Sequence, residues 1–184
     1  LLAKKIVAAD AWFNFDELAG LDKQYGAKAT YFFIAEYGKL NGLWNADYHL
    51  TGKKMREILR FLEENGNETG IHGSFGTHLN IKKIKNELKK FPKPVPGNRF
   101  HFLKYDIRTS PAILEESGIR FDSSLGFAEQ IGFRNGSCFP FYLYDLKNNR
   151  MREVLEIPLM VMDATLLEKR YMGCTHETAF SAAK

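Results

Sequence analysis

The sequence predicts a single α/β domain built around a mainly parallel sheet. Short runs rich in aromatic and β-branched residues alternate along the chain with amphipathic stretches of helical periodicity. These stretches are long enough to serve as right-handed crossovers between parallel strands. A chain of 184 residues with 45 % apolar content can bury one sizeable core, so we expect one domain over residues 1–184. The pattern leaves open an α/β barrel or an open doubly wound sheet.

The first half of the chain contains two helix-then-strand units. Residues 15–25 form an amphipathic stretch that ends before Gly26, and residues 28–36, KATYFFIAE, predict a buried strand. The second helix is expected to begin near Thr51 and to end near residue 65, before the strand ETGIH at residues 68–72. The buried stripe of that helix consists of Met55, Ile58, Leu59 and Leu62.

The second half of the chain continues this alternation. The lysine-rich helix IKKIKNELKK, residues 81–90, places its apolar residues opposite its lysines. A short helix is expected over residues 110–118, where Pro111 suits the first turn. Further strands are predicted at RFHFLKY (residues 99–105), IRFDSS (119–124), FPFYLYDL (139–146) and EVLEIPLMV (153–161).

Charge and cysteine usage exclude several classes of protein. The net charge is +4, and the lysine-rich helix is expected to present its charges to solvent, because no nucleic-acid motif accompanies it. No apolar run reaches the roughly 18 residues that a membrane-spanning helix needs. Cys138 and Cys174 are expected to be free thiols. The N-terminus has neither an initiator Met nor a secretory signal, so the compartment stays open.

Two histidines in the segment ETGIHGSFGTHLN, residues 68–80, suggest a metal site. His72 ends a predicted strand, where α/β proteins bind their ligands. The small residues that follow can turn the chain back and bring His78 toward the same point. Tetrahedral zinc, with nitrogen ligands at about 2.1 Å, needs two imidazole nitrogens roughly 3.4 Å apart. The alternative is a turn that carries two incidental histidines.

Several of these segments, taken in order, resemble a known family. KATYFF, ETGIH, NRFHF, FDSSLGF and GFRNGSCFPFYLYDL follow one another as in the polysaccharide deacetylases, carbohydrate esterase family four. The resemblance covers nearly the whole chain. It implies a distorted (β/α) barrel of the glycoside hydrolase/deacetylase type, here incomplete. It also implies removal of acetyl groups from an N-acetylated polysaccharide by an enzyme with a divalent metal, for which zinc is expected.

The resemblance assigns roles to residues of this chain. His72 matches the first histidine ligand of the metal, and His78 is the candidate for the second, although the family places that histidine at the position of Gly76. Arg99 matches the arginine that positions a catalytic aspartate. Phe102 matches the aromatic residue whose backbone N–H stabilises the negative charge that develops on the substrate oxygen.

Two further residues are candidates for contact with the substrate. Asp122 ends a predicted strand, and His101 alternates with Phe100 and Phe102 along another. A turn at Asp122 and core packing of His101 are the alternatives. The expected partner is an N-acetylated polysaccharide, with no nucleic acid and no membrane span. A homo-oligomer is a further expectation, because an incomplete barrel exposes strand edges.

The chain departs from the family pattern at both ends. The acidic pair expected on the first strand is missing, since KKIVAAD offers only Asp10, and the last histidine motif is absent. We therefore expect a domain truncated at both ends, whose own activity stays open. One alternative is a non-catalytic carbohydrate-binding domain on the same fold. Another is a barrel glycosidase, which would need two carboxylates about 5.5 to 9.5 Å apart, with Glu36 and Glu156 as candidates.

Overall fold

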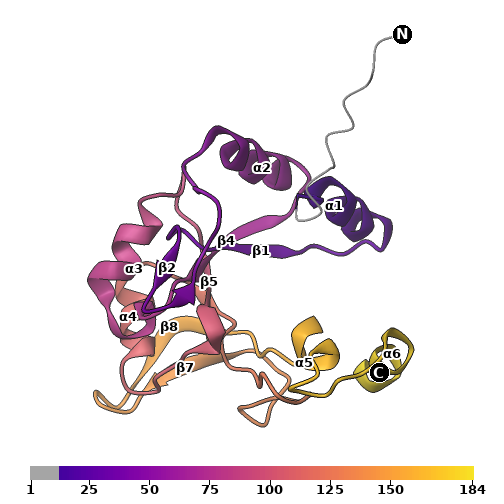
Figure 1. Ribbon diagram of the computed structural model, residues 1–184. Helices are drawn as coiled ribbons and strands as arrows, with labels where there is room; N and C mark the ends of the chain where they lie inside the picture. The colour runs from indigo at the N-terminus through magenta and orange to yellow at the C-terminus, as the bar shows by residue number, and fades with distance from the viewer. Residues whose placement is uncertain (1–12) are drawn as a thin grey trace.

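The computed structural model describes residues 13–184 and contains a six-stranded sheet that curls into part of a barrel (Figure 1). The strand order is β1-β4-β5-β6-β8-β7, and all pairs are parallel except β7 with β8. The predicted incomplete (β/α) barrel is therefore confirmed. The strands are β1 (Thr30–Phe33), β4 (Glu68–Gly73), β5 (Gly97–Phe100), β6 (Phe121–Asp122), β7 (Phe141–Asp145) and β8 (Arg150–Glu156), and a separate hairpin pairs β2 (Lys39–Leu40) with β3 (Leu43–Trp44).

Helices lie on both sides of this sheet. In Figure 1, α2, α3 and α4 run along one side, whereas α5 and α6 lie on the other. The helices are α1 (Phe15–Gln24), α2 (Lys53–Glu64), α3 (Ile81–Leu88), α4 (Ser110–Glu116), α5 (Asp163–Leu167) and α6 (His176–Ala183), and two short 3-10 helices are η1 (Thr77–Leu79) and η2 (His101–Leu103). None of the helices between residues 13 and 184 is both long and apolar enough to cross a membrane.

The main core lies between the sheet and helices α2, α3 and α4. Successive side chains of a strand point to opposite faces, so the register of the pairs sorts the residues of the sheet. Ile71, Phe100 and Val154 point to the face covered by these helices, which we call the helix face. His72 and Arg99 are paired on the opposite face, which we call the cleft face. Fully buried leucine and isoleucine side chains of the three helices complete the core at Leu59, Leu62, Ile84 and Leu114.

Two phenylalanine rings fill the middle of the cleft face. Phe32 is paired with Gly70, and Phe121 is paired with Gly97. A methyl group at Gly70 would lie 2.7 Å from the Phe32 ring, and one at Gly97 would overlap the Phe121 ring. The rings therefore occupy the space that side chains at the two glycines would need, and they close the middle of the curled sheet.

Three of the differences between the structure and the predicted elements concern residues near the site or the helices beside it. The strand predicted over residues 99–105 ends at Phe100, because Phe102 and Leu103 have left-handed backbone conformations, with φ of 59° and 51°. The strands predicted at 139–146 and 153–161 form an antiparallel hairpin, since the connection from Asp145 to Arg150 is too short for a crossover. Helix α2 begins after Gly52, without a side-chain cap from Thr51.

Other expectations are confirmed. Cys138 and Cys174 are free thiols. The lysine-rich helix buries Ile84 and is followed by the buried Phe91. Of its lysines, Lys82, Lys85 and Lys89 are exposed, whereas Lys83 and Lys90 are half-buried and donate to backbone carbonyls. It also buries Glu87 completely, which the sequence analysis missed.

Candidate active site

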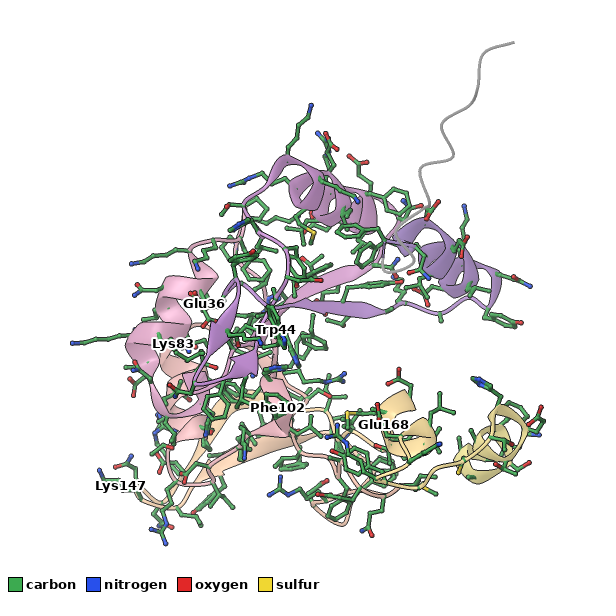
Figure 2. The ribbon with its side chains drawn as sticks, in the orientation of Figure 1. Glu36, Trp44, Lys83, Phe102, Lys147 and Glu168 are labelled. Atoms are coloured by element: carbon green, nitrogen blue, oxygen red, sulfur yellow. The ribbon has the colours of Figure 1, made fainter. Side chains whose placement is uncertain are left out.

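A cleft of about 830 Å³ lies at the carboxyl ends of the central strands. His72 at the end of β4, Arg99 on β5 and Phe102 in η2 line one wall, and the segment around α5 lines the other. Figure 2 shows Phe102 near the centre of the molecule, close to Trp44 of the β2–β3 hairpin. Three residues that the sequence analysis selected thus meet in one cleft.

His72 is a partly buried imidazole at the end of β4 that lines the cleft. Burial lowers its pKa to about 3, and the nearby His101 and Arg99 act in the same direction, whereas a backbone hydrogen bond with Arg99 opposes them. The ring is therefore neutral at neutral pH. A neutral imidazole has a free lone pair, which is the form that binds a metal ion.

His101 is the imidazole that lies against His72. The Nδ1 atom of His101 is 3.2 Å from Nε2 of His72, and the two ring planes make an angle of 74°. The other ring nitrogen of His101, Nε2, lies 2.8 Å from the carbonyl oxygen of Trp44. A carbonyl can only accept, so this nitrogen carries the proton and Nδ1 is the acceptor. We expected His101 to contact substrate, and the structure pairs it with His72.

His78 lies apart from this pair. It belongs to η1, and its ring packs edge-on against Phe100, 6.1 Å between centroids, at the helix face. Its carbonyl oxygen accepts a hydrogen bond from the Ser110 hydroxyl at the start of α4. The structure therefore brings His72 together with His101 and seats His78 elsewhere, and the role of His78 as a metal ligand stays a prediction.

Two imidazoles alone do not make a complete metal site. Within residues 13–184, no group of three or more His, Cys, Asp or Glu side chains is arranged to hold a metal ion. Asp10, the acidic candidate near the N-terminus, lies outside the described residues. Metal binding therefore stays a prediction for this chain.

The loop that follows His72 is held by helix α3. The carboxylate of Glu87 accepts hydrogen bonds from the backbone N–H and from the hydroxyl of Ser74, and the ammonium of Lys83 donates to the carbonyl of Phe75. Burial raises the pKa of Glu87, and the bonds from Ser74 oppose that rise. The signal in the sequence was an acidic residue three positions after Ile84, on the apolar side of the helix. These hydrogen bonds tie the loop after His72 to α3.

Arg99 holds the segment after β6. Its Nε donates to the carbonyl of Ser123 at 3.0 Å, and its Nη2 donates to the Ser123 hydroxyl at 2.9 Å. The guanidinium also lies over the Phe32 ring, 4.8 Å from its centroid. Burial lowers the pKa of Arg99, while Asp122 and Glu156 act against this. The side chain thus positions backbone beside the cleft.

Phe102 combines an unusual backbone with an exposed ring. Its φ of 59° and ψ of 21° lie in the left-handed region, which is uncommon for residues other than glycine. Its side chain is 51 % exposed and lines the cleft. Uncommon backbone conformations of this kind gather at functional sites, where the surrounding structure holds them in place.

Asp122 does not reach the cleft. Its side chain is fully buried at the helix face, where it accepts hydrogen bonds from Asn98 at 2.6 Å and from the Ser124 hydroxyl at 2.9 Å. A side chain buried in this way does not contact substrate in the cleft, as we had expected of Asp122. Its neighbour in the register, Glu156, is also fully buried and accepts from the N–H of Leu125. Glu156 therefore cannot serve the alternative glycosidase mechanism in this conformation.

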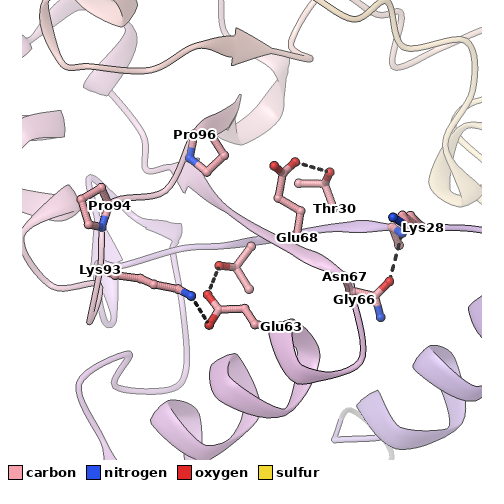
Figure 3. Close-up of a pocket in the computed structure, with 11 residues that line it drawn as sticks. Lys28, Thr30, Glu63, Gly66, Asn67, Glu68, Lys93, Pro94 and Pro96 are labelled. Carbon is pink, nitrogen blue, oxygen red and sulfur yellow. Dashed lines mark hydrogen bonds and ion pairs between the residues drawn. The ribbon is translucent and has the colours of Figure 1, made fainter.

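A second hollow, of about 610 Å³, lies at the amino ends of β1 and β4 (Figure 3). Its acidic groups have partners: Glu63 contacts Lys93 at 2.7 Å, and Glu68 accepts a hydrogen bond from Thr30. In α/β barrels the amino ends of the strands serve stability, and the carboxyl ends carry the active site. We therefore place the candidate site in the cleft with His72.

The strand order and the curled, mainly parallel sheet define an incomplete α/β barrel with a cleft at the carboxyl ends of its strands. A protein of Mycobacterium smegmatis, provisionally assigned as a polysaccharide deacetylase, has a solved structure that matches with a TM-score of 0.59 at 15 % sequence identity. The match covers 91 % of this chain and 56 % of that protein, so the chain spans little more than half of its length. No family model matches the sequence, and no curated protein matches it. At this identity the likeness establishes the fold.

Proposed function

We propose that the chain is a deacetylase-like hydrolase that removes acetyl groups from an N-acetylated polysaccharide with the help of a divalent metal, zinc being the expected ion. The observation that carries this proposal is the cleft in which His72, Arg99 and Phe102 meet. The ordered sequence motifs and the fold shared with the Mycobacterium smegmatis protein support it.

The proposal gives each residue of the cleft a role. His72 offers a neutral imidazole nitrogen to the metal, which would polarise the acetamide carbonyl and lower the pKa of water. Arg99 fixes the backbone at Ser123 beside the cleft. The backbone N–H of Phe102 stabilises the negative charge that develops on the carbonyl oxygen. His78 remains a candidate ligand by its place in the motif.

A proton acceptor is also required. Glu129 and Asp163 are the carboxylates among the described residues that line the cleft. We propose that one of them accepts the proton of the attacking water, in place of the aspartate that the family carries on its first strand.

Release of acetate from N-acetylglucosamine oligosaccharides tests the proposal. We expect His72→Ala to lower the rate by about 100-fold or more, because oriented electrostatic and metal contacts commonly contribute that much. His176→Ala is the matched control, since His176 is exposed at the start of α6. Equal acetate release by wild type and His72→Ala would refute a catalytic role for this cleft.

A second function is favoured by one observation. No cluster of three metal-binding side chains occurs in the described residues, yet the cleft region exposes Trp44 and Phe102, which are 57 % and 51 % exposed. Aromatic faces of this kind can stack on sugar rings. Binding of the oligosaccharides without acetate release would indicate a carbohydrate-binding domain.

Self-association is a further part of the proposal. Strand β7 is an edge of the sheet, and Tyr142 and Tyr144 on it are exposed. Such edges pair readily with other strands. We expect sedimentation of the chain to show a dimer or larger species, and a monomer at all concentrations would contradict this.

A further inference from the structure

The spacing of two imidazole nitrogens in the cleft is that of metal ligands. Nε2 of His72 and Nδ1 of His101 are 3.2 Å apart. Two nitrogens bound to a tetrahedral zinc ion at 2.0–2.1 Å are separated by about 3.4 Å. The ring planes meet at 74°, so the rings are not stacked on one another. In the tautomer of His72 that carries its proton on Nδ1, both facing nitrogens have lone pairs, and a metal ion can be held by both after a shift of a few tenths of an ångström.

The outer nitrogen of His101 is already fixed. Nε2 lies 2.8 Å from the carbonyl oxygen of Trp44, in the β2–β3 hairpin. Histidine ligands of metals commonly donate their second N–H to a carbonyl or carboxylate, which fixes both the tautomer and the ring orientation. Trp44 provides that contact, and it leaves the lone pair of Nδ1 directed toward His72.

His78 is held away from this position. Its segment η1 is fixed by Thr77, which is fully buried and donates its hydroxyl hydrogen to the carbonyl of Ser74 at 2.7 Å. The His78 carbonyl is bound by Ser110, and the ring packs on Phe100. Moving His78 to His72 would break these contacts, whereas His101 needs no rearrangement.

We propose that His72 and His101 form the two-imidazole part of a divalent-metal site, with Trp44 positioning His101 through its carbonyl. The catalytic use of this metal rests on the proposed function, whereas the choice of the two histidines rests on their distance and hydrogen bonds. Imidazole nitrogens favour zinc, cobalt, nickel and copper over magnesium and calcium. His72 lines the cleft, from which water, substrate or a further ligand can complete the coordination.

Metal titrations of the whole chain test the site directly. Zinc binding is measured by calorimetry at neutral pH, and cobalt binding by the visible absorption of the ion, in wild type, His72→Ala, His101→Ala, His78→Ala and the control His176→Ala. We expect His72→Ala and His101→Ala each to weaken binding by about 10-fold or more. We expect His78→Ala and His176→Ala to bind like wild type.

A second measurement needs no substitution, in case a variant fails to fold. Nuclear magnetic resonance of the imidazole nitrogens of the wild-type chain should show zinc-dependent shifts at Nε2 of His72 and Nδ1 of His101, and unchanged signals for His78. Shifts at His78 in place of His101, or no zinc binding at all, would overturn the inference. Zinc binding by the pair without acetate release would support the site and refute the proposed hydrolase.

Discussion

The two faces of strand β5 carry polar groups of opposite character. Arg99 points to the cleft face, beside His72, while its neighbour Asn98 points to the helix face and donates to Asp122. The cleft groups are anchored by backbone carbonyls and open to a hollow of about 830 Å³. The groups on the helix face are sealed. Proximity to the carboxyl end of a strand is thus not sufficient for function, because the face decides whether a polar side chain meets a ligand.

The sealed network is built on a pair of carboxyl groups. Asp122 and Glu156 lie opposite one another in the register, and both are completely buried. Burial raises the pKa of each, and the charge of Asp122 raises that of Glu156 further. At neutral pH the pair therefore keeps a proton, held by Glu156. We therefore expect the buried network to contribute to the stability of the fold, and the cleft to be the place where a ligand binds.

The largest expected effect comes from opening the sealed network. Asp122→Ala removes the acceptor for Asn98 and for the hydroxyl and N–H of Ser124, which then stay buried without a partner. We expect a loss of about 3 kcal/mol in the free energy of unfolding, measured by urea denaturation. Asp122→Asn is the matched control, with a smaller loss. His72→Ala should cost less than either, and the reverse order would contradict the division between the two faces.

The second test addresses the middle of the cleft face. Gly97→Ala places a methyl group inside the ring of Phe121, and we expect a loss of about 1–3 kcal/mol from overpacking. The control is Gly20→Ala in the exposed part of α1, where no atom lies within 4 Å of the added methyl group. That change should stabilise the chain by about 0.5–1 kcal/mol. Equal effects of the two substitutions in thermal unfolding would show that the rings do not fill this space.

The third test uses pH on the sealed face. The pKa of Glu156 is raised from its ordinary value to about 10, so the folded state holds this proton more tightly than the unfolded state. The contribution is complete below the ordinary pKa of glutamate and is lost as the pH rises toward about 10. We expect the free energy of unfolding to fall between about pH 5 and about pH 9. Glu156→Gln should reduce this fall, and an identical pH profile for the two proteins would contradict the assignment.

The smallest expected effect lies outside both faces, at Glu115 on α4. Burial raises the pKa of this carboxyl somewhat, but hydrogen bonds from Arg150, the N–H of Glu153 and Arg152 together lower it to about 2. A lowered pKa gives stability that is present above the ordinary value and lost as the pH falls toward 2.

Glu115→Gln should therefore make acid unfolding less steep between about pH 4.5 and about pH 2, as followed by circular dichroism. The change should be modest, because partly exposed ion pairs contribute little. Glu64→Gln, at an exposed position of α2, serves as the control. A larger change for the control would show that Glu115 is not the group that titrates.

Most elements of the fold could be predicted from periodicity, but the faces of the short strands could not. Hydrophobic spacing located α1 to α4 and β4, and it placed His72 at the end of a strand. Asp122 was misplaced because β6 has only two residues, too few for an alternation that shows which side is buried. Its partner Glu156 is distant in sequence and becomes a neighbour only through strand pairing.

The partner of His72 was missed for a different reason. The residues RFHFLKY alternate as a strand would, so His101 was predicted to follow Arg99 in an extended conformation. The chain instead turns at Phe102, and a phenylalanine in the sequence gives no indication of a positive φ. The contact between His101 and His72 joins residues 29 positions apart, and no local pattern encodes such a contact.

The contact between His101 and Trp44 has a consequence for how the chain can change during evolution. The acceptor is a main-chain oxygen, which every residue type supplies. This contact therefore does not depend on the side chain at position 44, whereas an insertion or deletion in the hairpin would move the oxygen and release the imidazole. Among descendants of this sequence, we expect the length of the segment from Lys39 to Trp44 to be preserved more strictly than its composition.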